Sequence, residues 1–290
     1  MATDKVKYRL QGHEKFPLRE GWINKGLQIV SSEPEPFTRK DAPDVFGIGN
    51  NMVKSLRYWM KAMGLTTDNG TQLTSLGVLI NKYDPYMEMN FTLWLLHSYI
   101  AKNITDATTW YMFFNRCNAI DLDKEQICSI LNREITKYVS GQSFSEKSLS
   151  TDVDVLLNMY SKTKDNTDPE DKNVSPFAKL GLVKCSEGKY TKQHPDMRIF
   201  NEYIVLYELS FIFGERDNIS IEEVINGENG LANLYNLTSL MANGYLDRLD
   251  AAGYIRVDRT AGLDMVYLIE PINGDAIIEN YYKACKGGKQ

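Results

Sequence analysis

Polar and basic side chains recur along the stretch 50–61 at a spacing that would let a helix read DNA. Their amide, ammonium, hydroxyl and guanidinium groups are the types that contact base edges in a major groove or hold backbone phosphates. A solvated helix face also needs such groups, so a DNA-reading helix and a plain surface helix are about equally favoured. The candidate DNA-contacting residues of this face are Asn50, Asn51, Lys54, Ser55 and Arg57.

Other basic residues could assist on DNA phosphates. Lys5, Lys7 and Arg9 belong to a basic arm over residues 1–19, and Lys40 precedes a short helical turn. Contacts of this kind contribute affinity and register without reading the base sequence. We expect these four side chains to hold the DNA backbone if the helix reads DNA.

The turn Gly47-Ile-Gly-Asn-Asn51 enters this helix and could receive a phosphate on its backbone N–H groups. It lacks the third glycine and the Lys-Ser or Lys-Thr pair of nucleotide-binding loops. Glycines also open helices for purely geometric reasons. A structural turn is therefore the favoured alternative.

No motif for catalysis or for a metal stands out in the sequence. The histidines His13, His97 and His194 show none of the spacings of metal sites, and His97 follows an apolar run typical of a core histidine. Asp84, directly before Pro85, is interpreted as a turn cap. A nucleophile elbow, a P-loop and the protein-kinase motifs are missing. We predict no enzyme activity, no catalytic residue, no metal and no cofactor.

The composition is that of an ordinary globular protein, but its charge is unevenly distributed. Of 290 residues, 43% are hydrophobic and 24% charged, and the net charge is −5. Residues 1–62 hold 11 Lys and Arg against 7 Asp and Glu, whereas residues 201–290 hold 7 against 14. Electrostatic attraction follows the local potential, so a phosphate-facing surface belongs in the first part of the chain.

Targeting and redox signals indicate a cytoplasmic protein. No apolar stretch resembles a signal peptide or reaches the length of a membrane span. The four cysteines are scattered and form no CxxC pair, which favours free thiols in a reducing compartment. We expect no membrane partner.

The helix that presents the candidate residues is predicted over residues 50–63. Apolar residues recur inside it at steps of three, four and three and therefore share one face. They are Val53, Leu56, Met60 and Met63. Asn50 suits the N-cap, and Gly64 suits a left-handed turn at the C-terminal end.

The elements around this helix match the plan of a winged-helix DNA reader. A helix over 21–30, a loop over 31–40 and a short helical turn over 42–46 precede it. A turn over 66–70 and a strand over 72–80 are predicted after it. Helix, turn, helix and hairpin in this order is the winged-helix arrangement.

The rest of the chain continues with helices and hairpins. In the middle we predict helices over 89–102, 108–117, 122–139 and 145–160, followed by a mobile polar loop over 162–175. Toward the end we predict helices over 199–213, 220–224, 238–252 and 276–282, a hairpin of 255–257 with 265–269, and a frayed tail over 283–290.

A short pattern occurs three times: a glycine, a large apolar residue and a hairpin-like stretch. It begins at Gly64-Leu65, Gly181-Leu182 and Gly253-Tyr254. The irregular spacing indicates three domain-scale units and not a solenoid. The predicted fold is mainly α with small β-hairpins, with multiple winged-helix units around a helical middle.

Three domains are predicted from this pattern. They are an N-terminal winged-helix-like unit over 1–83, a helical middle with a second such unit over 84–198, and a C-terminal winged-helix unit over 199–290. The helix predicted over 238–252 carries Asp247 and Asp250, which would repel phosphate. It is therefore expected to pack on another unit or on a protein partner.

Three blocks of the sequence resemble a known family. They are His13-Glu-Lys-Phe-Pro-Leu-Arg-Glu-Gly-Trp-Ile-Asn-Lys-Gly26, Gly47-Ile-Gly-Asn-Asn-Met-Val-Lys-Ser-Leu-Arg-Tyr-Trp59, and Asp84-Pro-Tyr with Thr92-Leu-Trp-Leu-Leu-His97. Together they resemble the bacterial domain-of-unknown-function family numbered four thousand and seven, over nearly the whole chain. Members are often encoded beside phosphoadenosine-phosphosulfate-reductase-like genes of DNA phosphorothioation and phage-defence clusters. The resemblance implies a DNA-linked accessory role and supplies no catalytic residue.

Two functional hypotheses follow. The first is a DNA-binding accessory or regulatory protein of a bacterial DNA-modification or phage-defence cluster, without catalysis of its own. The second is a protein-interaction scaffold that uses its winged helices to bind protein subunits of the same cluster. The basic first part favours the first hypothesis, and the acidic last part favours the second.

Overall fold

The computed structural model describes residues 5–162, 174–262 and 264–287. The chain forms two compact units, one within residues 1–193 and one within residues 194–290. The domain boundary predicted at 83/84 falls inside the first unit, so a separate N-terminal domain stays a prediction. None of the described helices is long and apolar enough to cross a bilayer.

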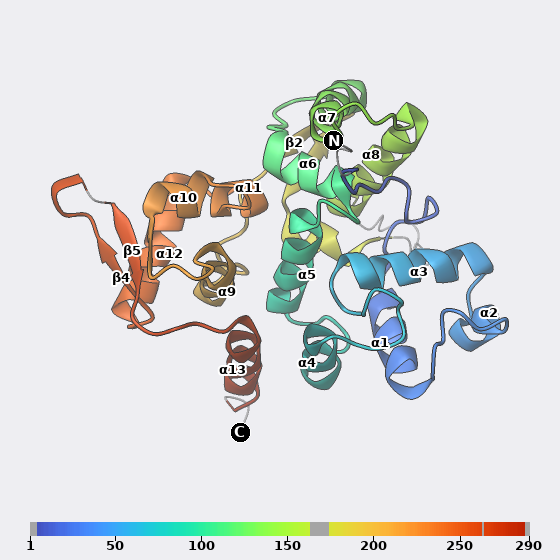
Figure 1. Cartoon of the computed structure of the whole chain (residues 1–290), viewed down its shortest axis with the longest axis horizontal. Helices are drawn as coiled ribbons and strands as arrows, with labels where there is room; N and C mark the ends of the chain where they lie inside the picture. The colour runs from blue at the N-terminus through green and yellow to red at the C-terminus, as the bar shows by residue number, and fades with distance from the viewer. Residues whose placement is uncertain (1–4, 163–173, 263, 288–290) are drawn as a thin grey trace. The chain divides into compact units, whose positions relative to one another are not determined.

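The first unit is a helical assembly with one small hairpin (Figure 1). Its helices are α1 (Trp22–Ser32), α2 (Ala42–Phe46), α3 (Asn50–Ala62), α4 (Ser75–Tyr83), α5 (Asn90–Lys102), α6 (Thr108–Arg116), α7 (Lys124–Tyr138), α8 (Glu146–Ser161) and the 3-10 helix η1 (Pro176–Leu180). Strands β1 (Val183–Ser186) and β2 (Lys189–Lys192) pair antiparallel. The core is aromatic, with Trp59, Trp94 and Trp110 fully buried.

The second unit combines short helices with a three-stranded antiparallel sheet. Its elements are α9 (Glu202–Ile212), β3 (Asn218–Ser220), α10 (Ile221–Asn226), α11 (Leu231–Tyr235), α12 (Ser239–Ala251), β4 (Ile255–Asp258), the 3-10 helix η2 (Thr260–Gly262), β5 (Met265–Leu268) and α13 (Gly274–Gly287). The strand order is β3-β5-β4. A mainly α fold with small hairpins is therefore confirmed.

The strand predicted over 72–80 is wrong: residues 75–83 form helix α4. Thr74 caps this helix, since its hydroxyl oxygen accepts the N–H of Gly77 at 3.1 Å. Leu76 and Ile80 are buried whereas Val78 is 52% exposed, which is the burial pattern of a helix and not of a strand. The hairpin in this region is reduced to a single bridge between Thr66 and Leu73.

Other predicted boundaries also shift. Helix α3 begins at Asn50 itself, so the residue at the N-cap is Gly49 and not Asn50. The closing helix α13 is longer than predicted and includes most of the tail expected to fray. Residues 163–173 of the predicted mobile loop, and 288–290 of the tail, lie outside the described residues.

The three repeated glycines adopt the same backbone conformation. Gly64, Gly181 and Gly253 have φ of +67°, +66° and +79°, in the left-handed region that favours glycine. They follow α3, η1 and α12, and each precedes a bridge or hairpin. The repeat seen in the sequence is thus a repeated helix-to-hairpin turn.

A longer repeat of connectivity becomes visible in the structure. In the second unit, β3 follows α9 and pairs with β5, the second strand of the hairpin after α12. In the first unit, Leu122 follows α6 and pairs with Tyr190 of β2, in the hairpin after α8. The two segments thus share one order of elements, with a single β-bridge at Leu122 in the first unit where the second unit has the strand β3.

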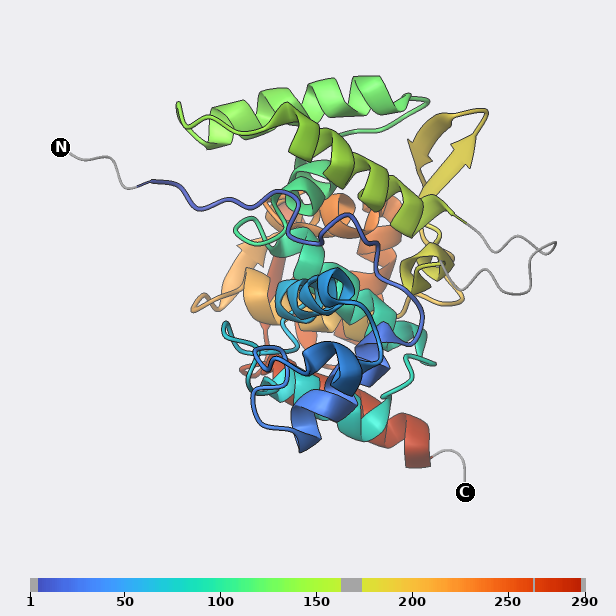
Figure 2. The same ribbon diagram turned by 90° about the vertical axis from the view of Figure 1, so that its right-hand side faces the viewer.

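A buried ion-pair-like contact attaches the N-terminal arm to the first unit. His13 Nε2 lies 2.9 Å from Asp152 Oδ1, and both side chains are buried. The same carboxylate accepts the N–H of Gln11 at 2.8 Å and the hydroxyl of Thr109 at 2.8 Å. The arm therefore runs along α8 before it reaches α3 (Figure 2).

We expect Asp152→Ala to lower the free energy of unfolding by about 3 kcal/mol, because two buried donors and one partly buried donor lose their acceptor. Asp154→Ala on the same helix is the matched control. Asp154 is half-exposed and pairs with Lys124 at 2.7 Å, so its loss should cost about 1 kcal/mol or less. Urea denaturation of both variants measures the difference, and equal costs would contradict the buried network.

Candidate nucleic-acid interface

The first half of α3 presents an open polar face. Asn50, Asn51 and Lys54 are exposed, and the first turn contains no acidic residue. The Lys54 ammonium lies 3.5 Å from the amide oxygen of Asn51 and forms no ion pair with a carboxylate in the described part of the chain. Three of the predicted DNA-contacting residues therefore share an accessible surface with an uncompensated positive charge.

Ser55 does not belong to this face, which corrects the sequence-based prediction. It is fully buried, and its hydroxyl donates to the carbonyl of Phe16 at 3.2 Å. The indole N–H of Trp59 donates to the same oxygen at 3.1 Å. The arm covers this side of α3, so the buried stripe is wider than the apolar periodicity alone indicated.

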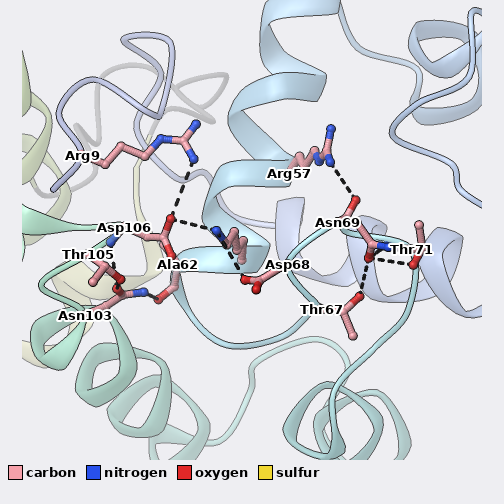
Figure 3. Close-up of polar contacts among 11 residues, drawn as sticks. Arg9, Arg57, Ala62, Thr67, Asp68, Asn69, Thr71, Asn103, Thr105 and Asp106 are labelled. Carbon is pink, nitrogen blue, oxygen red and sulfur yellow. Dashed lines mark hydrogen bonds and ion pairs between the residues drawn. The ribbon is translucent and has the colours of Figure 1, made fainter. Parts of the chain in front are cut away.

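Arg57 is half-buried and holds the loop after α3. Its Nη2 donates to the backbone carbonyl of Asn69 at 2.7 Å, as Figure 3 shows. The side-chain oxygen of Asn69 accepts from the hydroxyls of Thr67 at 2.9 Å and Thr71 at 2.8 Å. Because a carbonyl does not cancel the guanidinium charge, Arg57 adds positive potential beside Lys54.

The last turn of α3 is neutralised by carboxylates. Lys61 Nζ lies 2.9 Å from Asp106 and 3.4 Å from Asp68 (Figure 3). Arg9, predicted to assist on phosphates, lies 3.9 Å from the same Asp106 and stacks its guanidinium over the ring of Tyr58 at 5.1 Å. The positive face of α3 is therefore strongest at its N-terminal half.

The remaining predicted phosphate contacts are exposed but are not grouped with Lys54 by any contact. The arm around Lys7 bonds to the end of α7, where the Tyr138 hydroxyl donates to the Lys7 carbonyl at 3.1 Å. Lys5 precedes it on the exposed arm. Lys40 is exposed beside Arg39, whose guanidinium is bound by Asp41 at 2.6 Å and lowers the pKa of that carboxyl. Their role on DNA stays a prediction.

Two basic residues near the site were not among the predicted DNA-contacting residues. Lys61 lies seven residues after Lys54, and this spacing places it on the same polar helix face. Lys25 of α1 donates to the carbonyl of Phe46 at 2.8 Å, directly before the Gly47 turn that leads into α3. No local sequence signal indicated that contact, because the two residues are brought together only by the packing of α1.

Helix α12 of the second unit presents a different surface. Leu240 in its first turn is 84% exposed. Arg259, between β4 and β5, bonds Asp247 at 2.7 Å and the Asn243 amide oxygen at 2.8 Å. Arg259 is thus already paired with side chains of α12, and the apolar Leu240 is exposed in the first turn of this helix.

Asp84 behaves as the predicted cap. Its buried carboxylate accepts the N–H of Glu88 at 2.9 Å and of Met89 at 3.1 Å, and the hydroxyl of Thr92 at 2.5 Å. Burial raises the pKa of this carboxyl. Within the ranges that the structure describes, no group of three or more His, Cys, Asp and Glu side chains could hold a metal ion.

Comparisons with known proteins give a family and a fold. The sequence model described as "Protein of unknown function (DUF4007)" matches residues 10–282. No curated protein matches the chain. A magnesium ion-bound SspB crystal structure is similar with a TM-score of 0.82 and 21% identity over 97% of this chain and 89% of that chain. A second SspB crystal structure is similar with a TM-score of 0.79 and 21% identity over 99% of this chain and 89% of that chain. At this identity the likeness shows the fold.

We expect Ser55→Ala to lower the free energy of unfolding by about 1 kcal/mol through loss of a buried hydrogen bond. Lys54→Ala, one residue away but exposed, should leave stability within about 0.5 kcal/mol. Urea denaturation distinguishes the two positions. A Ser55→Ala protein that is as stable as the parent would place Ser55 at the surface, against the geometry described.

Proposed function

Because the chain belongs to the DUF4007 family, whose description names no activity, we propose from its geometry that it binds DNA. The role is that of an accessory or regulatory protein in a bacterial DNA-modification or phage-defence cluster, in the cytoplasm. The observation that carries this proposal is the exposed, uncompensated positive face of α3 around Lys54 and Arg57. We propose recognition only and no catalytic step.

The proposal includes three winged-helix units. Strand β3 follows α9, and strands β4 and β5 follow α12. The sheet order β3-β5-β4 is the order expected when a winged-helix hairpin returns beside the first strand. The bridge of Leu122 with Tyr190 gives the segment from α6 to β2 the same plan. In the segment from α1 to α4, helix α3 takes the place of the recognition helix and the bridge of Thr66 with Leu73 takes the place of the wing.

Among the three corresponding helices, α3 is the best candidate for DNA. Its outward side chains are amides and cations, whereas α12 offers Leu240 and the paired Asp247. In α8, Asp152 is buried as the acceptor of the arm and Asp154 is exposed. Phosphate attraction decays within about 10 Å at ordinary salt, so local charge decides between these helices.

Protein subunits encoded in the same cluster are the proposed partners of the second unit. Leu240 on α12 is 84% exposed, and burying this side chain against a protein partner would be favourable. If α3 does not bind DNA, the scaffold function becomes the leading proposal for the whole chain.

The double variant Lys54→Ala with Arg57→Ala tests the DNA-binding proposal. We expect duplex DNA affinity at near-physiological salt to fall by at least about tenfold. The slope of log affinity against log salt should become shallower by about two, because two phosphate-facing charges are lost. Fluorescence anisotropy with a labelled duplex, repeated from low to high salt, measures both quantities.

Arg198→Ala with Lys283→Ala is the matched control, since it removes one Arg and one Lys from exposed positions of the second unit. It has the same effect on net charge and should leave affinity and slope unchanged. Parental binding by the α3 double variant, or equal losses in both double variants, would refute a specific α3 interface.

Neutralising Asp106 should strengthen DNA binding. Asp106→Asn removes the carboxylate shared by Lys61 and Arg9, so Arg9 becomes available to phosphates and Lys61 keeps only its contact with the exposed Asp68. We expect roughly two- to fivefold tighter binding at low salt and a smaller gain at high salt. Asp154→Asn makes the same charge change beside Lys124 on α8 and serves as control. Equal gains from both substitutions would show only a net-charge effect.

A further inference from the structure

A cavity of about 320 Å³ lies at the start of α1 and shares no lining residue with the proposed α3 interface. Its wall combines the end of the arm and first turn of α1 with Tyr86, Met87 and residues of η1. Ligand pockets in proteins typically begin at about 300 Å³, the size needed for a small molecule. The cavity is therefore large enough to be tested as a binding site.

Two donors in this wall have no acceptor. Arg19 Nε and Asn24 Nδ2 are shielded from solvent, and neither donates a hydrogen bond. Both side chains line the cavity. Buried polar groups are almost always paired, because an unpaired one loses its hydration without compensation. Two side chains of this wall therefore carry N–H donors that are free to pair with an acceptor on a ligand.

The charges of the wall favour an anionic acceptor. Its charged members are Arg19, Lys179 and Glu20, and Lys179 neutralises Glu20 at 3.1 Å. The Arg19 guanidinium is held by aromatic faces, 5.5 Å from the ring centre of Trp22 and 6.0 Å from that of Phe16. Its charge remains available to a ligand, and a guanidinium binds phosphate well.

The cavity wall also contains aromatic and apolar side chains. Tyr86 is 67% exposed and stands beside Met87 and Pro176. An exposed tyrosine ring next to an anion-binding wall offers a stacking surface for a flat ring attached to the anion. We propose that this cavity binds the phosphate monoester of a nucleoside, with the phosphate on Arg19 and Asn24 and the base on Tyr86.

The position of the donors determines how the ligand enters. Both donor atoms are shielded from solvent. Binding therefore has to turn the Arg19 and Asn24 side chains toward the ligand, which moves the guanidinium relative to the Trp22 ring. Trp22 is buried. Its fluorescence emission should therefore report the movement of the guanidinium and not a change in the contact of the ring with water.

The experiment titrates the full-length protein with AMP, inorganic phosphate and adenosine, by tryptophan fluorescence and by calorimetry. AMP should bind tightest, and adenosine at least about tenfold more weakly because it lacks the phosphate. Arg19→Gln and Asn24→Ala should each weaken the binding of AMP by about tenfold. Tyr86→Ala should weaken the binding of AMP and leave the binding of inorganic phosphate unchanged. The variant Lys54→Ala with Arg57→Ala is the control and should bind AMP as the parent does.

Circular dichroism first establishes that each variant is folded. Equal affinity for AMP and adenosine, or parental AMP binding by both folded Arg19→Gln and Asn24→Ala, would overturn the proposal. Competition by a 5′-phosphorylated oligonucleotide but not by its unphosphorylated form would support it and identify a DNA end as the source. If AMP binds and neither oligonucleotide competes with it, the proposal is supported and the ligand is a free nucleotide. Loss of α3 binding to duplex DNA leaves these results unaffected, so the two proposals fail separately.

Discussion

The buried hydrogen bond between His13 and Asp152 determines which side of α3 meets solvent. His13 Nδ1 accepts the N–H of Lys15 at 3.1 Å, so Nε2 carries the proton and donates to Asp152. The imidazole ring stacks on Trp59 with 5.6 Å between centres and 7° between planes. With His13 fixed in this way, the carbonyl of Phe16 reaches Ser55 and Trp59. The arm then closes one side of α3 and leaves Lys54 on the open side.

The three copies of the glycine turn share a backbone conformation but are surrounded by different side chains. Gly64, Gly181 and Gly253 end their helices with equivalent left-handed conformations, which is a demand of the backbone and independent of function. The side chains around them are free to differ. Cations stand on α3, the arm covers α8, and Leu240 is exposed on α12. A repeated backbone plan therefore gives no reason to expect three equivalent binding surfaces.

Local signals in the sequence were sufficient for much of the fold. The apolar steps of α3 and the glycine after it predicted a real helix and a real left-handed turn, and the hairpins β1–β2 and β4–β5 were also predicted. The error at α4 arose because apolar residues over 73–80 fit both a strand and a helix, and the capping Thr74 was overlooked. Ser55 was misplaced for a different reason: the arm that covers it lies 39 residues earlier. The contact of His13 with Asp152 spans 139 residues and has no local signature.

Helix α1 lines the proposed cavity and packs against α3, but the two proposed sites have separate functions. A Cβ at Gly26 would lie only 2.7 Å from Met60 Sδ, so α1 and α3 pack with almost no space between them. Lys25 adds a bond to the carbonyl of Phe46, before the turn into α3. The three blocks that carry the family resemblance meet here, since the first lines the cavity and contacts α3, and the third supplies Tyr86. Such tight packing resists small displacements. A substitution that empties the cavity of its ligand should therefore leave the outer face of α3 in place, which is why the two sites can be judged independently.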